Sequence, residues 1–352
     1  MLKLMDKVVF FLSLPAILGL IGAYGASFIP PHVFAFPSLL SLAYPYLLIL
    51  NLLFFLYWLF RWKKTVWLQL AVLLAGIPAF RSYYGTADTQ AAEEKPDISL
   101  LSYNVRYFDM YGWSNKTNTG EKLFAYLNKF PGDLICLQEF MLASAAEKQK
   151  EIIGRLKSYP YHHVYKGMAI FSRLPLVHKG HLEFDDKYTS TCIYCDVVRG
   201  KDTVRLYSVH LESYRFGKKE RRFVKEVSSA MGRDELSEGV KNLTSRLTVA
   251  NRNRAFQAEE IKRHLESSPY PVILCGDFND TPLSYTYRRI KNGLQDAFIE
   301  KGRGLGNTYI GEFPSFRIDY IFHSPEMEAQ RYTRENIFLS DHDPIQADLR
   351  LK

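Results

Sequence analysis

Short apolar runs that end in a polar or ionisable side chain recur in a fixed order along the last two-thirds of the chain. They are LLSYNVR, ICLQE, YSVHLES, ILCGDFND and RIDYIF, and LSDHDP closes the series. A run of strand length followed at once by such a group is the pattern expected where a buried sheet presents chemistry at its rim. The side chains placed in this way are Asn104, Glu139, His210, Asp277, Asn279, Asp319, Asp341 and His342.

The donor atoms of this set favour one kind of site. Carboxylates and amides supply oxygen, and two imidazoles lie beside them. Such a pocket suits a hard divalent cation and a phosphate better than it suits zinc or copper. The sequence therefore predicts Mg²⁺ or Mn²⁺ as cofactor.

The ordered series resembles the endonuclease/exonuclease/phosphatase superfamily, which includes DNase I, AP endonucleases, neutral sphingomyelinases and inositol polyphosphate 5-phosphatases. The resemblance runs from about Ile98 to Leu351. It implies a four-layer α/β sandwich, in which two packed mixed sheets are flanked by helices, and a hydrolase that acts on phosphoester bonds. A membrane-anchored binding or scaffold protein on the same fold is the alternative, and it predicts losses at Glu139, Asp277 or His342 that this chain does not show.

The resemblance also implies which residues hold the metal and the substrate. Glu139 is the expected metal ligand, and Asp341 would share the metal or its water shell. Asn104 and Asn279 would bind the substrate phosphate, because their amides donate hydrogen bonds without adding negative charge to an acidic site.

The remaining four residues are the expected catalytic groups. Asp277 would orient or deprotonate the attacking water, and His342 would contact the phosphate or transfer a proton. Asp319 would hold the other ring nitrogen of His342. His210 would stabilise charge or protonate the leaving group. AP endonucleases carry an aspartate where this chain has Arg106 and a tyrosine where it has His210, so abasic-site repair is disfavoured.

Residues 1–80 have a different composition from the rest. Asp, Glu, Lys and Arg are absent from residues 8–60. Residues 8–28 and about 37–60 are each long enough to cross a hydrocarbon core of roughly 30 Å, and residues 65–80 are apolar but short. We predict a membrane region with two to three transmembrane helices at 1–80, a polar linker at 81–97 and the catalytic domain at 98–352. A secretory signal peptide would explain only the first span.

The positive charges predict how the chain is oriented. The cytoplasmic side should hold Lys3, Lys7, Arg61, Lys63 and Lys64. Three crossings then place the catalytic domain outside the cytoplasm, on the periplasmic or extracellular side. If residues 65–80 do not cross, the same rule places the domain inside.

The substrate stays open at this stage. In residues 215–263, Lys and Arg outnumber Asp and Glu by 13 to 7, and such a segment could attract any polyanion or be an ordinary solvated helix face. Nucleic acid, a phospholipid headgroup and a small phosphoester all fit as partners, alongside the membrane, and no obligate protein partner is inferred. Aromatic residues that could rim the pocket or belong to the core are Tyr107, Phe108, Tyr111, Trp113, Tyr214 and Phe216.

Strand and helix signals alternate through residues 98–352. Strands are expected at 97–105, 134–138, 169–172 and 272–275, with a hairpin of 191–198 and 203–210 that turns at Arg199 and Gly200. Helices are expected at 121–128, at 145–158 with a capping box of Ser144 and Glu147, and at 246–267.

Overall fold

The protein is described from a computed structural model that covers residues 2–87, 95–110, 112, 114, 116–140, 146–184, 190–217, 220, 222–223, 232–311 and 315–352. Contacts along the chain group into two compact units. The first unit contains the chain up to Ser82, Tyr214–Phe256 and Asp280–Arg289. The second contains Tyr83–Ser213, Gln257–Asn279 and Ile290–Lys352. The boundaries 1–80, 81–97 and 98–352 drawn from the sequence stay a prediction, and the contacts add that two later segments group with the N-terminal region.

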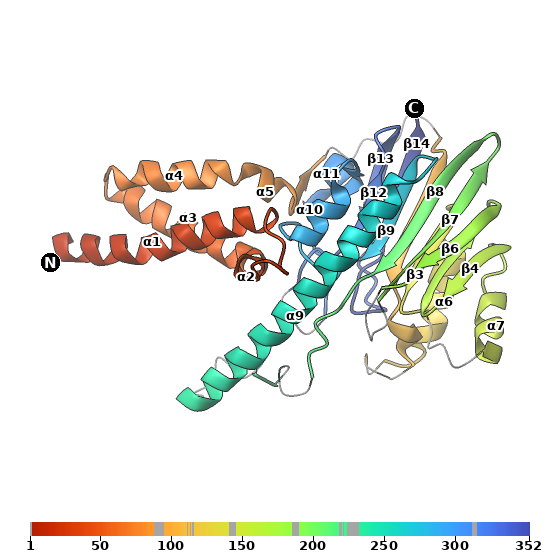
Figure 1. Cartoon of the computed structure of the whole chain (residues 1–352), viewed down its shortest axis with the longest axis horizontal. Helices are drawn as coiled ribbons and strands as arrows, with labels where there is room; N and C mark the ends of the chain where they lie inside the picture. Colours follow the sequence, from red (N-terminus) through yellow and green to blue (C-terminus); the bar gives the residue numbers. More distant parts are fainter. Residues whose placement is uncertain are drawn as a thin grey trace. The chain divides into compact units, whose positions relative to one another are not determined.

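The second unit is built on two six-stranded sheets (Figure 1). One sheet has the order β10-β12-β9-β8-β7-β6, with β10 (Gln295–Asp296), β12 (Asp319–His323), β9 (Val272–Asp277), β8 (Asp202–His210), β7 (Thr191–Arg199) and β6 (Leu176–Leu182). The other has the order β13-β14-β2-β3-β5-β4, with β13 (Met327–Arg334), β14 (Ile345–Leu351), β2 (Ile98–Asn104), β3 (Leu134–Gln138), β5 (Met168–Ser172) and β4 (Tyr161–Tyr165). The pairs β2 with β3 and β8 with β9 are parallel, and the neighbours around them are antiparallel.

Alternate residues of β2 face two different cores. Leu100 of β2 lies in one apolar cluster with Leu206 of β8 and Ile273 of β9, so this cluster joins the two sheets. Leu101 of β2 lies in another cluster with Leu123 of α6 (Thr119–Lys129), which covers the outer face. Successive side chains of a strand point to opposite faces, so one strand serves both layers. The predicted sandwich of two mixed sheets flanked by helices is confirmed.

Several elements match the sequence closely, and some differ. β3 has the predicted bounds, and β7 and β8 form the predicted hairpin with Gly200 at a φ of 61° in the turn. α7 (Ala146–Gly154) ends before residue 158, at a glycine, and the expected capping residue Ser144 lies outside the described residues. The smaller elements of this unit are η1 (Arg106–Asp109), α11 (Ala297–Lys301) and the paired strands β1 (Tyr84–Thr86) and β11 (Arg303–Leu305).

The helix expected at 246–267 begins earlier than the sequence pattern indicated. α9 runs over Arg233–Glu266, and its first turn carries Asp234 and Glu235. Acidic residues there stabilise a helix through its dipole, but the polar residues and Gly239 that follow conceal the apolar period. Like α9, the helix α10 (Tyr285–Lys291) contributes residues to both units.

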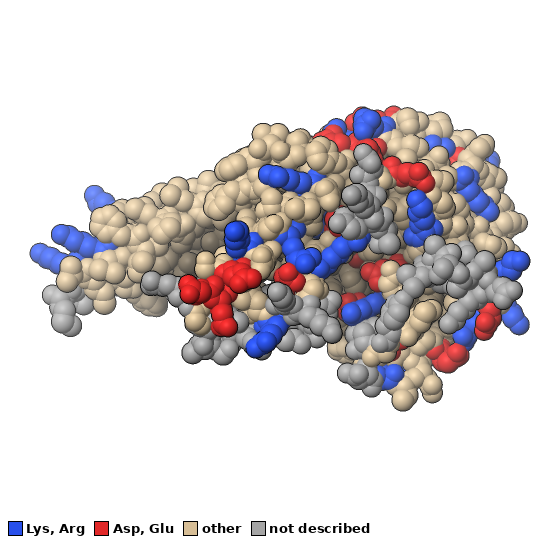
Figure 2. Space-filling view, turned by 60° about the horizontal axis from the view of Figure 1, so that its bottom comes forward, with Lys and Arg blue, Asp and Glu red and all other residues tan. Residues whose placement is uncertain are grey.

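The first unit contains the N-terminal apolar helices: α1 (Leu2–Ala26), α2 (Phe36–Leu42), α3 (Tyr44–Phe60), α4 (Thr65–Ala75) and α5 (Ile77–Arg81). By length and composition, α1 could cross a membrane, and α2 with α3 could form a second span although they meet at a bend of 72°. α4 is apolar and shorter. In Figure 2 these helices have a surface almost free of charged side chains except at the far left end, where Lys and Arg gather.

Contacts within this unit give α4 a direction along α1. At one end, Asp6 of α1 pairs with Arg61 at 3.0 Å and with Lys63 at 3.7 Å, just before α4 begins. Toward the other end, the Tyr24 hydroxyl of α1 donates to the carbonyl of Val72 in α4 at 3.4 Å. α4 therefore runs beside α1 from the Asp6 end toward the Tyr24 end, although its 11 residues are fewer than half of the 25 in α1.

Candidate active site

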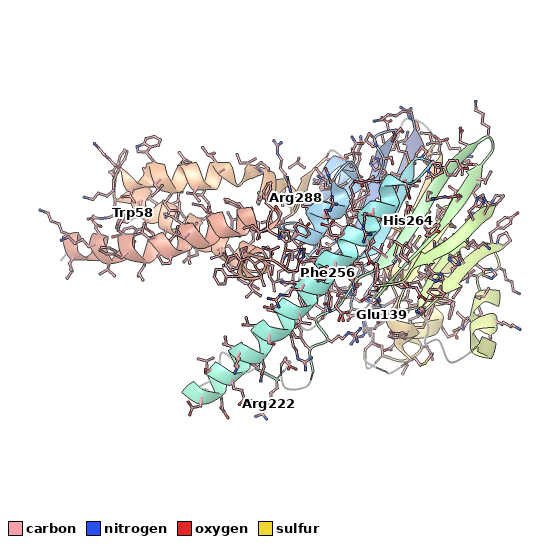
Figure 3. All side chains as sticks on the ribbon, in the orientation of Figure 1. Trp58, Glu139, Arg222, Phe256, His264 and Arg288 are labelled. Atoms are coloured by element: carbon pink, nitrogen blue, oxygen red, sulfur yellow. The ribbon has the colours of Figure 1, made fainter. Side chains whose placement is uncertain are left out.

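Strands of both sheets end at one place in the second unit. β2 ends at Asn104, β8 ends at His210 and β9 ends at Asp277, while β12 begins at Asp319. Within their sheet, Asp277 is the register partner of both His210 and Asp319. Glu139, labelled in Figure 3, follows Gln138, the last residue of β3, and Asp341 and His342 precede β14.

The most buried part of the site is a hydrogen-bonded pair next to a second carboxylate. The Nδ1 atom of His342 lies 2.9 Å from Oδ2 of Asp319, and its Nε2 atom lies 3.7 Å from Oδ2 of Asp277. All three side chains are at least nine-tenths buried. The predicted pairing of Asp319 with His342 is thus present in the geometry.

Burial sets the protonation of this part. Burial raises the pKa of Asp277 to about 6, and the Asp319 charge adds to the effect although His342 and His210 oppose it. Burial alone would lower the pKa of His342, but the charges of Asp319 and Asp277 outweigh it and hold that pKa well above its usual value. The imidazole is therefore held as a cation between two carboxylates near neutral pH.

His210 and Asn104 connect this buried part to Glu139. The Nε2 atom of His210 lies 3.6 Å from Oε1 of Glu139 and 3.8 Å from Oδ2 of Asp277. The Asn104 amide donates to Asp277 at 3.0 Å and has a longer contact of 3.5 Å with Glu139. One amide and one imidazole thus each face both carboxylates.

The more open part contains Glu139, Asp341 and Arg106. The Arg106 guanidinium donates to Oδ2 of Asp341 at 2.6 Å, and the Arg106 backbone N–H donates to Oδ1 of Asn104 at 3.1 Å. Burial raises the pKa of Glu139, and the negative charge of Asp341 adds to the rise. Of the two carboxylates in this part, Asp341 is thus paired with Arg106.

Three of these residues have an uncommon backbone conformation. Glu139 has a φ of 48°, Asn279 a φ of 52° and Arg106 a φ of 42°. Non-glycine residues rarely adopt the left-handed region, and such positions cost of order 1 kcal/mol or more unless neighbours hold them. The Asn279 N–H donates to Asp277 at 2.8 Å and its side-chain amide donates to the carbonyl of Leu211 at 3.1 Å, which fixes this conformation.

Two groups of side chains have the chemistry to bind a metal. Among the described residues, one ligand atom each from Asp277, Asp319 and His342 lies within 4.8 Å of the others. A metal there would compete with the hydrogen bond between His342 and Asp319. Glu139 and Asp341 are more accessible, with side chains 24% and 13% exposed, and their carboxylate oxygens suit a hard divalent cation.

The structure adds two residues to the site that the sequence analysis left unassigned. Ser340 donates its hydroxyl to the carbonyl of Asn104 at 2.8 Å, and the Tyr309 ring meets the His342 ring edge-on at 5.4 Å. Tyr309 also pairs with His342 through an isolated β-bridge. Ser340 is visible in the sequence as the residue before Asp341, whereas no local pattern indicates Tyr309.

Residues outside this site have structural contacts. Arg173 donates to the carbonyls of Pro131 and Phe130 at 3.0 Å each, so it holds a loop. Phe108 stacks on Phe124 at 4.5 Å and packs with the outer core, whereas Tyr111 and Trp113 lie outside the described residues. In the segment 215–263, Arg246 pairs with Glu220 at 2.7 Å. At least this positive charge of the segment is therefore compensated by a neighbouring carboxylate.

Two family models match the chain. The model described as the Endonuclease/Exonuclease/phosphatase family matches residues 101–342, and a domain of unknown function, DUF8431, matches residues 6–83. Among curated proteins, no sequence matches.

Several solved structures share the fold. D. rerio TDP2, solved in complex with a single-strand DNA product, is 17% identical with a TM-score of 0.51, covering 72% of this chain and 98% of that one. An endonuclease/exonuclease/phosphatase from Bacteroides vulgatus is 17% identical with a TM-score of 0.51, covering 72% and 99%. A mannosyl-6-phosphatase from Bacteroides thetaiotaomicron is 20% identical with a TM-score of 0.50, covering 72% and 99%.

Proposed function

Because the chain belongs to the endonuclease/exonuclease/phosphatase family and is a hydrolase acting on phosphoester bonds, we propose that it is a membrane-anchored, divalent-metal-dependent phosphoesterase. One observation carries the proposal: the ends of β2, β3, β8 and β9 and the start of β12 bring carboxylates, an amide and an imidazole to one place. His342 completes the site through its hydrogen bond to Asp319.

Each residue has a task in this proposal. A bound Mg²⁺ or Mn²⁺, held by Glu139 and Asp341, would supply positive charge to the phosphoryl oxygens. Asp277 accepts a proton from the attacking water, for which a pKa of about 6 is suitable near neutral pH. Asn279 would donate its second amide hydrogen to the phosphate, and Asn104 would do so in place of its longer contact with Glu139.

The two imidazoles work at different positions. His342 is held as a cation by Asp319 and donates its Nε2 proton toward the phosphate. His210 faces both Glu139 and Asp277 and serves as the second imidazole, stabilising charge at the leaving oxygen.

Membrane anchoring rests on the first unit. α1 is long and apolar enough to cross, and its charged residues gather at the end where Asp6 pairs with Arg61. At the opposite end, the turn between α1 and α2 contacts segments from later in the chain: the His32 ring stacks on Phe256 of α9 at 4.8 Å. The positive residues near α1 and before α4 belong on the cytoplasmic side, and three crossings would then place the catalytic domain outside the cytoplasm.

Reporter fusions test the orientation. A reporter that is active only outside the cytoplasm should be active when fused after Asp97 and silent when fused after Lys64. A silent fusion after Asp97 would place the domain in the cytoplasm.

The substrate class is tested with the full chain in detergent or lipid nanodiscs, since Tyr214–Phe256 and Asp280–Arg289 group with the N-terminal helices. The panel is DNA, RNA, a sphingomyelin-type lipid and phosphomonoesters, each with Mg²⁺ or Mn²⁺ and each with chelator. The fold is shared with a protein solved with DNA and with a sugar phosphatase, so it leaves both diesters and monoesters in the panel. Turnover that survives the chelator would contradict the metal requirement.

A further inference from the structure

Arg254 of α9 is fully buried in the first unit, and none of the roles above uses it. Its guanidinium donates to Oδ2 of Asp280 at 3.1 Å and to Oδ1 of Asn251, and it lies over the Tyr214 ring at 4.5 Å. A buried charge is tolerated only when it is paired and hydrogen-bonded. Arg254 therefore fixes the two side chains it contacts.

One end of this network is next to a residue of the site. Asp280 directly follows Asn279, whose left-handed backbone must be held in place. Asp280 is 6% exposed, and its Oδ1 accepts the Thr281 N–H at 3.0 Å while its Oδ2 accepts from Arg254. The ion pair with Arg254 thus holds the residue after Asn279, and it adds to the bonds that Asn279 makes with Asp277 and Leu211.

The other end of the network lies in the N-terminal helices. The Asn251 side-chain amide donates to the Ser38 hydroxyl at 2.7 Å, and that hydroxyl donates to the carbonyl of Ala35 at 2.6 Å. Ser38 belongs to α2 and is 6% exposed. A chain of buried hydrogen bonds therefore runs from Ser38 through Asn251 and Arg254 to Asp280.

Neighbouring contacts hold the same surfaces together. The Arg288 guanidinium lies 3.7 Å from the centre of the Phe28 ring, and Arg252 donates to the carbonyl of Pro31 at 3.4 Å. Figure 3 labels Phe256 on α9 and Arg288 on α10. α2 and the turn before it are thus held to α9 and α10 at several points within this unit.

From this chain of contacts we infer that Asn251 and Arg254 are positioning residues. Through their hydrogen bonds to Ser38 of α2 and to Asp280, they help to hold the backbone at Asn279. The inference rests on the proposed role of Asn279 in binding the substrate phosphate. The N-terminal helices then contribute to catalysis itself as well as to anchoring, and loosening their end of the network slows turnover.

The test uses Ser38→Ala in the full chain in nanodiscs, because this change removes the acceptor of Asn251 and leaves the Arg254–Asp280 ion pair intact. Ser41→Ala is the matched control: Ser41 is also a buried serine of α2, but its hydroxyl donates only to the Ser38 carbonyl at 2.8 Å among the contacts described. Activity is measured on bis(4-nitrophenyl) phosphate and 4-nitrophenyl phosphate with Mg²⁺.

We expect Ser38→Ala to lower kcat by about 10-fold, since roughly one buried hydrogen bond is lost, with KM changed less than about 2-fold. Ser41→Ala should leave kcat near the wild-type value. Arg254→Lys keeps the positive charge but loses the several N–H donors of the guanidinium. Its kcat should be intermediate between those of the wild type and Arg254→Met. Equal losses in the two serine variants, or an unchanged kcat in Ser38→Ala, would overturn the inference.

A second readout does not depend on activity. Hydrogen exchange of the peptide that contains Asn279 and Asp280 should be faster in Ser38→Ala than in the wild type, and unchanged in Ser41→Ala. If the wild type hydrolyses neither ester, the proposed function loses its support, while hydrogen exchange still decides whether α2 holds the Asn279 backbone. Identical exchange in all three proteins would show that it does not.

Discussion

The two sides of the active site contain similar carboxylates but compensate their charge differently. On the buried side, Asp277 and Asp319 are almost fully enclosed, and His342 lies between them as a fixed partner. On the open side, Glu139 and Asp341 are partly exposed, and the nearest cation is the long side chain of Arg106. A partner supplied by the fold, such as His342, suits carboxylates that orient groups and transfer protons. Carboxylates that bind an ion from solution need a partner that can be displaced.

The two sides also differ in the groups that oppose the effect of burial on the carboxylate pKa values. Burial raises the pKa of both Asp277 and Glu139, and the His342 imidazolium opposes the rise at both, but its ring nitrogen lies 3.7 Å from Asp277. His342, Asn104 and Arg106 together do not offset the effect of burial and of Asp341 on the pKa of Glu139, so a bound cation would compensate this carboxylate further. Changes on the open side should therefore alter metal dependence, and changes on the buried side should not.

The largest expected effect is that of Glu139→Gln. Removing the charge of the expected metal ligand should lower kcat by at least about 100-fold and raise the Mg²⁺ concentration needed for half-maximal rate. Magnesium titrations of both proteins measure the two effects. An unchanged magnesium requirement would place the metal elsewhere, with the group of Asp277, Asp319 and His342 as the next candidate.

Asp319→Asn is expected to have a somewhat smaller effect on the opposite side. The rate should fall by about 10- to 100-fold, because His342 loses the partner that orients its ring and keeps it charged. The half-maximal Mg²⁺ concentration should stay at the wild-type value, and circular dichroism should show an intact fold. A shift in metal requirement as large as that of Glu139→Gln would remove the distinction between the two sides.

The pH dependence should follow Asp277. The base is active when deprotonated, so kcat should rise about tenfold per pH unit below about pH 6 and level off above it. Asp343 provides the control, since burial raises its pKa to about 6 as well. In Asp343→Asn the acid limb should remain in place, and its disappearance there would assign the limb to Asp343.

The smallest expected effect is that of Arg106→Gln. Arg106 and a bound cation compete for Asp341, so removing the guanidinium should tighten the apparent Mg²⁺ affinity by about 3-fold, in keeping with a partly exposed ion pair. The same substitution should weaken phosphate binding if Arg106 also contacts substrate. A magnesium titration and a KM measurement separate these effects, and weaker magnesium binding would contradict the competition.

The sequence predicted the parts of this structure that depend on local order. β3 was located to the residue, and the polar residues that end the strands converge as expected, because a strand places its last side chain at a defined edge. The sandwich could be predicted for the same reason. The roles assigned to the eight site residues remain predictions.

Contacts between distant segments could not be predicted in this way. Tyr309 reaches His342 through a single β-bridge, which has no sequence pattern of its own. Ser38 and Asn251 are separated by 213 positions, and each looks like an ordinary polar residue of its helix. Contacts of this kind depend on how distant segments pack in three dimensions. A single sequence contains no periodic pattern that indicates which distant residues will meet.

The strand β1 affects how easily the catalytic part could be released from the N-terminal helices by proteolysis. Tyr84–Thr86 lie within the segment predicted as a tether, yet they pair with β11, and Gly85 lies so close to Gly302 that an added Cβ would be 2.3 Å from its carbonyl oxygen. A protease that cut the chain between Ala87 and Lys95 would break its continuity but leave β1 hydrogen-bonded to β11. Shedding of the catalytic part by such a cut would therefore require this strand pair to separate, and a recombinant fragment starting at Lys95 would leave the β11 edge without its partner.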